Sequence, residues 1–313
     1  MFEIKRYEPS HEQAWNDFVA RSKNGTFLFD RRFMDYHSDR FADSSLMILR
    51  KGRIYALLPA NRVGDTLHSH QGLTYGGLLT DAKATAEGVM EAFGALNAWL
   101  RNEGVRRVTY KAMPWIYHRL PAEEDLYALT QVCHARLLTR EISSTILLQQ
   151  PLRFTESRKS GLRKALREGL YMEESGDLAA FWQMLDDNLA SRHHTHPVHS
   201  LDELRLLQGR FSQQIHLYLI YNKEKEPVGG TWVFDTGQVV HTQYIASTKE
   251  GKAHGALDLL FDELINRRYR EGIYLDFGKS TEEGGRVLNE HLIFQKEGFG
   301  GRGVCYDTYE WEP

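Results

Sequence analysis

Side chains that can move protons are concentrated in one stretch of the second half of the chain. An apolar and aromatic run, residues 239–246, predicts a strand in which His241 and Gln243 share one face and Tyr244 takes the other, because successive strand residues point to opposite faces. A second short strand further on carries Asp276 at its end. Histidine titrates near neutral pH, so His241 and Asp276 are the two candidates for a general base. For each, a structural role as a hydrogen-bonded strand residue is the alternative.

The turn between these two strands, residues 247–255, contains glycine and is basic. Apolar residues at helical spacing follow it over residues 256–265. Backbone N–H groups and the positive end of the helix dipole meet at such a turn, and Lys252 adds a charge. The turn is therefore predicted to be able to bind phosphate, and a helix N-terminus without a ligand is the alternative.

The same order of elements occurs in the first half of the chain. Residues 84–103 have helical spacing, Gly104 ends that helix, and residues 105–111 predict the strand after it, just as residues 273–277 follow the helix of the second half. Each helix is preceded by a meander of three strands. In the first half this meander includes a strand-like, glycine-rich run over residues 66–79.

These patterns predict an internal duplication at a period of about half the chain. The residues Gln149-Gln150-Pro151 interrupt a strand-like run, so we expect domains at residues 1–150 and 151–313. The expected fold class is α+β, with a mostly antiparallel central sheet flanked by helices in each domain. One large mixed sheet without a repeat is the alternative.

Composition limits the classes of partner and compartment. The formal charge of −3 over 313 residues gives no overall attraction to nucleic acid or to an anionic membrane. The two cysteines, Cys133 and Cys305, cannot form a disulfide scaffold. No apolar run is as long as a membrane span, and the N-terminus has no apolar core of a signal peptide. We therefore expect a cytoplasmic protein.

Four histidines lie within seven residues, at His193, His194, His196 and His199. A metal site is one interpretation, but no carboxylate or cysteine joins them at a regular helical spacing, and Pro197 makes the segment a loop. We therefore predict no metal. A polar loop over an acceptor pocket is preferred, which makes His193, His196 and His199 candidate substrate-binding residues.

A basic run at helical spacing comprises Arg158, Lys159, Arg163, Lys164 and Arg167. A solvated helix face is one interpretation. The other is a site for a phosphorylated donor or acceptor, because clustered cations attract phosphates. Under this second interpretation Arg158 and Lys159 are candidate substrate-binding residues.

Several segments resemble the GNAT N-acetyltransferase superfamily, in particular its tandem, FemAB-like branch. They are FTESRKSGLRKALREGLYMEES (residues 154–175), LDFGKS (275–280), Asn289 and QKEGFGG (295–301). The resemblance extends over nearly the whole chain. It implies two tandem GNAT-like domains, the second of which is expected to be the catalytic one.

The resemblance also implies acyl-CoA, such as acetyl-CoA, as a cosubstrate, with its pyrophosphate on the turn 248–255 and no metal. The fingerprint of that turn is imperfect, because Leu257 or His254, depending on register, replaces a required small residue. The corresponding turn of the first domain, residues 79–83, has no glycine, so that domain is predicted to bind no cofactor. The implied cofactor-binding residues are Ile245, Ala246, Lys252, His254, Gly255, Ala256 and Asn289.

The implied reaction is transfer of an acyl group to an amine acceptor such as an amino sugar or a cell-envelope precursor. It requires a base, a donor to the oxyanion and an acid for the departing thiolate. His241 and Asp276 are the base candidates, with Gln243 beside them. Many superfamily members place a tyrosine acid where this chain has Phe294, so the acid is unassigned unless Tyr244 or a water serves.

Two other functions remain open. FemAB-type proteins transfer amino acids from aminoacyl-tRNA to a peptidoglycan precursor, but the long helical-hairpin arm of their larger members is absent, and the net charge of −3 does not favour RNA. A catalytically degenerate GNAT-like binding protein is the third possibility, favoured by the altered fingerprint and the missing tyrosine. The sequence does not indicate an oligomeric state.

Overall fold

The computed structural model describes residues 1–193 and 196–313, and the chain divides into two compact units. Unit 1 comprises Met1–Ile142, Thr281–Val287 and Cys305–Pro313, and unit 2 comprises Ser143–Ser280 and Leu288–Val304. This division differs from a single boundary at residue 150. The chain changes unit within strand β8 (Arg136–Leu147), and two C-terminal segments return to unit 1.

Unit 1 contains two groups of strands. The first is an antiparallel sheet in the order β1-β2-β3-β6, formed by β1 (Phe2–Arg6), β2 (Leu46–Arg50), β3 (Arg53–Leu58) and β6 (Leu79–Thr80). The second has the order β4-β5-β7-β16 and includes β4 (Asn61–Val63), β5 (Thr66–His68), β7 (Arg107–Lys111) and β16 (Arg302–Trp311). Strand β5 runs parallel to β7, whereas β4–β5 and β7–β16 are antiparallel.

The helices of unit 1 are α1 (Glu12–Arg21), α2 (Arg31–Met34), α3 (Ala86–Asn102) and α4 (Glu124–Gln131). Short 3₁₀ turns lie at Pro9–His11, Phe27–Phe29, Asp35–His37, Trp115–Tyr117 and Glu283–Gly285. Helix α3 begins at Thr85, whose side chain accepts a hydrogen bond from Gly88 N at 3.2 Å. Its apolar stripe, which includes Val89, Phe93 and Leu96, is buried in the core as its spacing predicts.

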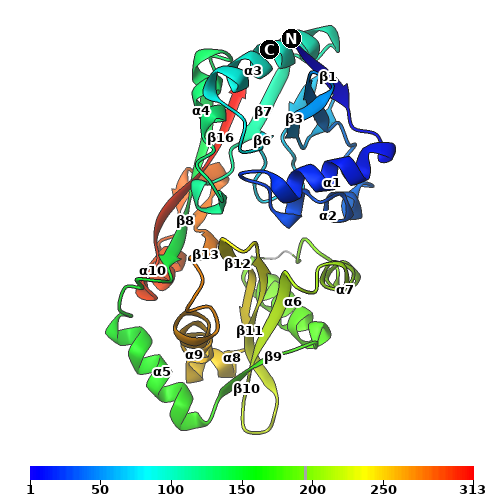
Figure 1. The fold of residues 1–313 in the computed structure, drawn as a ribbon. Helices are drawn as coiled ribbons and strands as arrows, with labels where there is room; N and C mark the ends of the chain where they lie inside the picture. The colour runs from blue at the N-terminus through cyan, green and yellow to red at the C-terminus, as the bar shows by residue number, and fades with distance from the viewer. Residues whose placement is uncertain (194–195) are drawn as a thin grey trace. The chain divides into compact units, whose positions relative to one another are not determined.

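Unit 2 has one sheet with the strand order β8-β13-β12-β11-β10-β9 (Figure 1). Its strands are β9 (Tyr171–Glu174), β10 (Ile215–Tyr221), β11 (Pro227–Asp235), β12 (Val239–Ser247) and β13 (Tyr274–Lys279), together with the end of β8. Neighbouring strands are antiparallel except β12 and β13, which are parallel. Two further strands, each of two residues, lie between β13 and the last helix: β14 (Thr281–Glu282) and β15 (Val287–Leu288).

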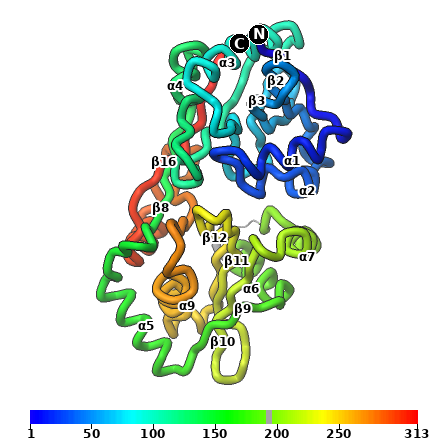
Figure 2. Tube along the Cα trace, viewed as in Figure 1, coloured from blue at the N-terminus to red at the C-terminus, as the bar shows by residue number. Residues whose placement is uncertain are grey.

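Helices cover both faces of the unit 2 sheet. They are α5 (Glu156–Glu168), α6 (Leu178–His193), α7 (Leu201–Arg210), α8 (Lys249–His254), α9 (Ala256–Glu263) and α10 (Glu290–Gly298). A π-helical turn, Leu264–Arg268, continues α9. Helix α5 runs beside α9 (Figure 2), and α6 packs against β11 and β12. Residues Leu259, Leu260 and Phe261 of α9 are buried against the sheet, as their spacing predicts.

The two units confirm the predicted α+β fold class of mostly antiparallel sheets flanked by helices. In each unit a long helix connects to a strand that pairs in parallel with an earlier one, β5 with β7 and β12 with β13. These parallel pairs are the common element of the duplication. They are also the positions where the units differ most.

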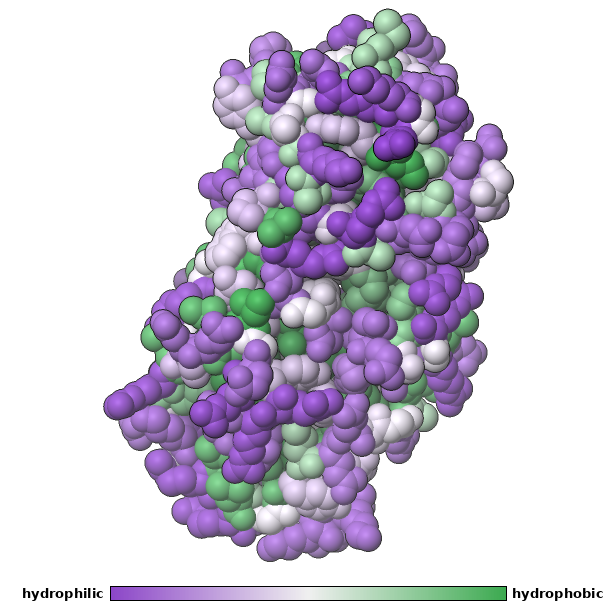
Figure 3. Space-filling view, viewed as in Figure 1, coloured by the Kyte–Doolittle hydropathy of each residue, from purple (hydrophilic) through white to green (hydrophobic). Residues whose placement is uncertain are grey.

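Hydrophilic side chains cover most of the face of the molecule shown in Figure 3, and hydrophobic ones form small separate patches among them. Among residues 1–193 and 196–313, no helix has the length and apolar character that a membrane crossing requires.

Candidate functional site

The predicted candidates His241 and Asp276 face each other across the parallel pair of unit 2. Among the described residues, the ladder between β12 and β13 ends with the pair His241–Asp276. Strand β12 also carries a bulge, because Trp232 of β11 lies opposite Tyr244 and Val233 lies opposite Thr242, which leaves Gln243 as the extra residue. The bulge reverses the alternation of side chains beyond it. Simple alternation would place Ile245 on the same face of the sheet as His241. Because of the bulge, Ile245 lies on the opposite face.

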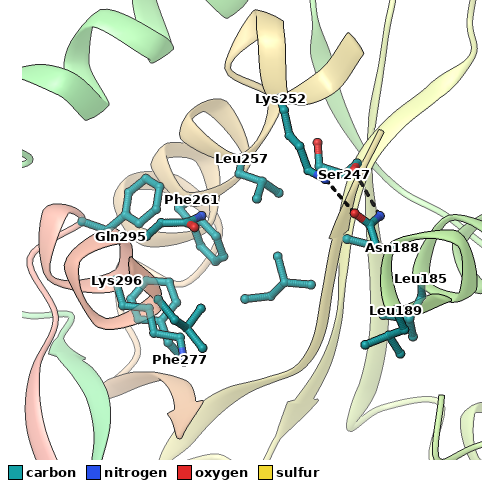
Figure 4. A pocket seen from close by; sticks show the side chains of 14 residues that line it. Leu185, Asn188, Leu189, Ser247, Lys252, Leu257, Phe261, Phe277, Gln295 and Lys296 are labelled. Carbon is teal, nitrogen blue, oxygen red and sulfur yellow. Dashed lines mark hydrogen bonds between the residues drawn. The ribbon is translucent and has the colours of Figure 1, made fainter. Parts of the chain in front are cut away.

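A pocket of about 320 Å³ lies beyond the end of this ladder (Figure 4). Residues 245–247 of β12 line one side of it, and Phe277 of β13 lines the other. The remaining lining residues come from α6 (Leu185, Asn188, Leu189), from α8 and α9 (Lys252, Leu257, Phe261) and from α10 and its end (Leu292, Gln295, Lys296, Phe299). The wall is mainly apolar with a few polar groups, which is the usual composition of a site for a small organic ligand.

Asn188 organises the polar side of the pocket. Its Nδ2 donates to the carbonyl oxygens of Met184 at 2.7 Å and Ser247 at 3.1 Å, and its Oδ1 accepts from Lys252 Nζ at 2.7 Å (Figure 4). This network fixes the end of β12 to α6 and holds the lysine at the wall. Lys252, Ile245 and Ala246 are thus the predicted cofactor-binding residues that the structure brings to the pocket.

Lys296 is a pocket residue that sequence reasoning did not single out. Its side chain is buried, and Nζ donates to the carbonyl oxygens of Gly278 at 2.8 Å and Lys279 at 2.9 Å and to Ser280 Oγ at 2.9 Å. Burial lowers the pKa of Lys296 to about 8, although the charge of Asp276 opposes this shift. The signal available in the sequence was its place inside the QKEGFGG segment.

His241 and Asp276 form one buried pair and are not two separate bases. His241 Nδ1 lies 2.9 Å from Asp276 Oδ2, while Ser143 Oγ and Thr145 Oγ1 donate to Asp276 Oδ1 at 2.5 and 2.8 Å. Asp276 is fully buried and His241 is 7% exposed. A carboxylate that accepts from Nδ1–H leaves the lone pair on Nε2, so this arrangement orients the imidazole as a base.

Gly278 connects the His241–Asp276 pair to Lys296, a residue of the pocket wall. A Cβ added to Gly278 would lie 3.3 Å from His241 Cε1, so the absent side chain leaves space at the edge of the ring. The carbonyl of the same glycine accepts a hydrogen bond from Lys296. Gly278 therefore lies between the His241 imidazole and the buried Lys296 ammonium.

Tyr244 lies in a different environment from the pocket. Its hydroxyl is 2.6 Å from His199 Nδ1, and its ring stacks on Trp232 at an interplanar angle of 15°. Burial raises the pKa of Tyr244 to about 12. The structure thus joins two predicted residues, Tyr244 and His199, and neither of them lines the pocket.

The predicted pyrophosphate turn forms a short helix of its own, and helix α5 covers its last residues. Residues Lys249–His254 form α8, and the Thr248 side chain accepts from Gly251 N at 3.0 Å. Gly255 has φ of +78° and lies so close to α5 that an added Cβ would be 2.3 Å from the Gly161 carbonyl oxygen. Gly255 and Ala256 are therefore buried beneath α5, and with His254 they do not line the pocket.

Helix α5 is attached to α9 by charge as well as by packing. Arg158 Nη1 donates to Asp258 Oδ1 at 3.0 Å, and burial raises the pKa of Asp258 to about 6 against the opposing effect of Arg158. Lys159 pairs with Glu156 at 2.7 Å on the exposed side of α5. Neither predicted substrate-binding cation of this helix lines the pocket.

The remaining predicted residues have structural partners or lie outside the described chain. Asn289 caps α10 by accepting from Leu292 N at 3.0 Å, and its helix contributes Leu292 to the pocket wall. His196 is exposed and pairs with Asp186 at 2.7 Å. The side chain of His193 lies outside the described residues. Among the residues that the structure describes, no group of three His, Cys, Asp or Glu side chains could hold a metal ion.

Comparisons with known proteins agree with this geometry. Residues 155–284 match the family model of the acetyltransferase (GNAT) domain. The chain is similar to the crystal structure of FemX, with 11% identity, 99% of this chain and 97% of that chain covered, and a TM-score of 0.68. It is also similar to L-PGS from Bacillus licheniformis, with 14% identity, coverage of 97% and 92%, and a TM-score of 0.62.

A tandem GNAT protein from the clavulanic acid biosynthesis pathway matches over 100% of this chain and 98% of that chain, with 12% identity and a TM-score of 0.51. No curated protein matches the sequence. At these identities the solved structures share the fold, while the domain match covers the residues that form most of unit 2.

Fold and domain match together define a class: residues 155–284 carry a GNAT acetyltransferase domain, and the whole chain has the fold of tandem GNAT proteins. The fold expected from the tandem, FemAB-like resemblance is confirmed, and the matched GNAT domain lies in unit 2, where the pocket is.

Proposed function

We propose that unit 2 transfers an acyl group from acyl-CoA to an amine acceptor. The observation that carries the proposal is the pocket at the end of the β12–β13 ladder, with Ile245 and Ala246 on one wall and Phe277 on the other. An apolar channel between two strands suits a pantetheine arm, and the backbone of β12 offers N–H groups to a thioester oxygen. The acceptor is proposed to be an amino sugar or another cell-envelope precursor, and the reaction is proposed to occur in the cytoplasm.

In the proposed reaction, His241 Nε2 takes the proton of the attacking ammonium, directly or through a water, while Asp276 stabilises the imidazolium. The amine nitrogen then forms a bond to the thioester carbon. The first proton passes from the imidazolium to solvent, and the imidazole then takes the second proton from the nitrogen of the tetrahedral intermediate. When the carbon–sulfur bond breaks, the imidazolium gives this second proton to the thiolate, so CoA leaves as a thiol and the product is a neutral amide. Lys296 is a fixed positive charge near the inner end of the pocket, where negative charge develops.

Donor binding is tested by thermal unfolding with millimolar acetyl-CoA. We expect the melting temperature of the wild-type protein to rise, and the rise to disappear in Leu257→Trp, which fills the pocket wall. Leu166→Trp is the matched control, because Leu166 is 57% exposed on α5 of the same unit. No shift in the wild-type protein, or an equal loss in both variants, would count against the proposal.

A second donor, aminoacyl-tRNA, is favoured by one specific observation. Helix α5 covers the start of α9, where the pyrophosphate of CoA was expected, and it presents the exposed cations Arg163 and Arg167. FemX and L-PGS share the fold of the chain, which is compatible with this donor. Binding of alanyl-tRNA that weakens steeply with salt and is lost in Arg163→Glu with Arg167→Glu, in the absence of an acetyl-CoA shift, would establish this donor instead.

A further inference from the structure

A second cavity, of about 940 Å³, lies within unit 1. Its walls come from α1, from the hairpin of β2 and β3, and from the loop before α3. Five of its lining residues are cationic, namely Arg21, Arg50, Lys51, Arg53 and Lys83. Only two, Asp17 and Asp81, are acidic, so the cavity is positive in a protein whose net charge is −3.

The cations are not neutralised by their surroundings. In the described chain, no carboxylate lies within 4 Å of the charged groups of Arg21, Lys51, Arg53 or Lys83. Arg50 has one distant partner, Glu91, at 3.8 Å. The two aspartates bind neutral donors instead: Asp17 accepts from Gln13 Nε2 at 2.8 Å and Asp81 from the backbone N of Lys83 at 2.9 Å.

The β2–β3 hairpin also holds two cations close together, and their electrostatic repulsion is destabilising. Arg50 and Arg53 are directly opposite residues of β2 and β3, and like charges in this position are destabilising. The guanidinium of Arg50 lies 5.2 Å and 5.9 Å from the ring centroids of Phe2 and Tyr55, which limits its freedom to move away. An anion bound between the two arginines would relieve their repulsion.

The walls of the cavity are fixed to one another before any ligand binds. The Tyr55 hydroxyl accepts from Thr85 N at 3.3 Å, which connects strand β3 to the start of α3. The close approach requires a glycine at position 88, since a Cβ there would lie 2.2 Å from the same hydroxyl oxygen. The cations are therefore presented by connected elements of a defined cavity.

We propose that this cavity binds the diphosphate group of a small molecule. Guanidinium groups bind phosphate oxygens in pairs, and several cations from different elements match a ligand with adjacent phosphates better than a single charge. The volume is within the range of sites for nucleotide-sized ligands. This site lies in unit 1 and shares no residue with the β12–β13 pocket of unit 2, and the proposal does not depend on which donor unit 2 uses.

The test is calorimetric titration of the whole protein with inorganic pyrophosphate at low ionic strength, with orthophosphate as the probe of lower charge. We expect pyrophosphate to bind and orthophosphate to bind at least about tenfold more weakly, because it contacts fewer cations. The variant Arg53→Gln with Lys83→Gln should weaken pyrophosphate binding roughly tenfold or more.

The matched control is Arg101→Gln with Arg106→Gln, which removes the same charge from exposed positions of unit 1 outside the cavity. It should retain pyrophosphate binding, and both variants should retain the acetyl-CoA shift if the donor proposal is correct. No binding by the wild-type protein, or equal losses in the two variants, would overturn the proposal. Binding of a short RNA hairpin in place of pyrophosphate would also overturn it, because the cations would then serve a nucleic-acid surface.

Discussion

The two units differ where their parallel strands part. In unit 2 the ladder ends at His241 and Asp276, and a pocket lies beyond it. In unit 1 the corresponding ladder ends at His68 and Thr109, but the chain after β5 stays attached to β7. Ser69 N donates to the Thr109 carbonyl at 2.9 Å, and Lys111 N donates to Ser69 Oγ at 2.8 Å.

The segment after β5 fills the space next to β7 with its own side chains and backbone. Lys111 Nζ donates to the carbonyls of His70, Gln71 and Leu73 at 2.9 to 3.3 Å, and Leu73, Tyr75 and Leu78 are buried. In unit 2 one strand, β12, pairs with both β11 and β13, whereas in unit 1 two strands, β6 and β5, divide these pairings. Both units thus retain the parallel pair. Among residues 1–193 and 196–313, a pocket lies next to the pair of unit 2, whereas the chain itself fills the space next to the pair of unit 1.

Replacing the histidine at the end of each parallel ladder should give the largest difference in effect between the two units. His241→Ala should reduce kcat by about 10²–10⁴-fold, because it removes the proposed base that Asp276 orients. His68→Ala, the matched change in unit 1, should leave kcat unchanged. Release of CoA thiol in the presence of an amine acceptor measures both, and similar losses in the two variants would contradict the assignment of chemistry to unit 2.

Adding a methyl group to a glycine with positive φ should test how firmly α5 packs against the start of α9. Gly255→Ala should lower the free energy of unfolding by roughly 3 kcal/mol, since φ is +78° and the new Cβ would meet the Gly161 carbonyl. Gly104→Ala at the end of α3 has φ of +70° and no atom within 4 Å of the new Cβ, so a loss of about 1 kcal/mol is expected. Denaturant unfolding measures both, and equal losses would show that α5 is easily displaced.

The buried ammonium of unit 2 should make stability depend on alkaline pH. The folded-state pKa of Lys296, about 8, is below its ordinary value, so between about pH 8 and 10.5 the unfolded chain binds more protons than the folded protein. Its contribution to the free energy of unfolding should therefore rise with pH, by on the order of 3 kcal/mol over this window.

The measurement is the difference in free energy of unfolding between wild type and Lys296→Met as a function of pH, which cancels the other titrating groups. Lys111→Met is the comparison in unit 1, because the Lys111 ammonium also donates three hydrogen bonds, all to carbonyls, but is only partly buried. A flat difference for Lys296→Met from pH 8 to 10 would show that its ammonium is solvated.

Much of the fold could be predicted from local patterns. The helical spacing of Val89, Phe93 and Leu96 and the capping position of Gly104 correctly predicted α3. The strand-like run over residues 66–79 was predicted less well, because only residues 66–68 and 79–80 are strands. Its glycines permit the chain to leave the sheet, and contacts with β7 decide where it does so.

The site was only partly predictable. His241 and Asp276 were named as alternative bases, and the register of β12 against β13 joins them into one pair. Ile245, Ala246 and Lys252 line the pocket, whereas His254, Gly255 and Ala256 do not. Helix α5, which covers this turn, is recognisable in the sequence only as a basic segment at helical spacing, far from the turn along the chain. No local pattern therefore links Gly161 to Gly255.

By itself the sequence determined the duplicated α+β pattern, the strand that carries the histidine, and the family resemblance of its C-terminal motifs. Tertiary structure alone decided that Lys296 is buried beside Gly278, that α5 occupies the start of α9, and that the segment after β5 closes the equivalent region of unit 1. The physical reason is that periodicity reports which face of an element is apolar. Burial of a charge and close approach of two backbones depend on which distant elements meet.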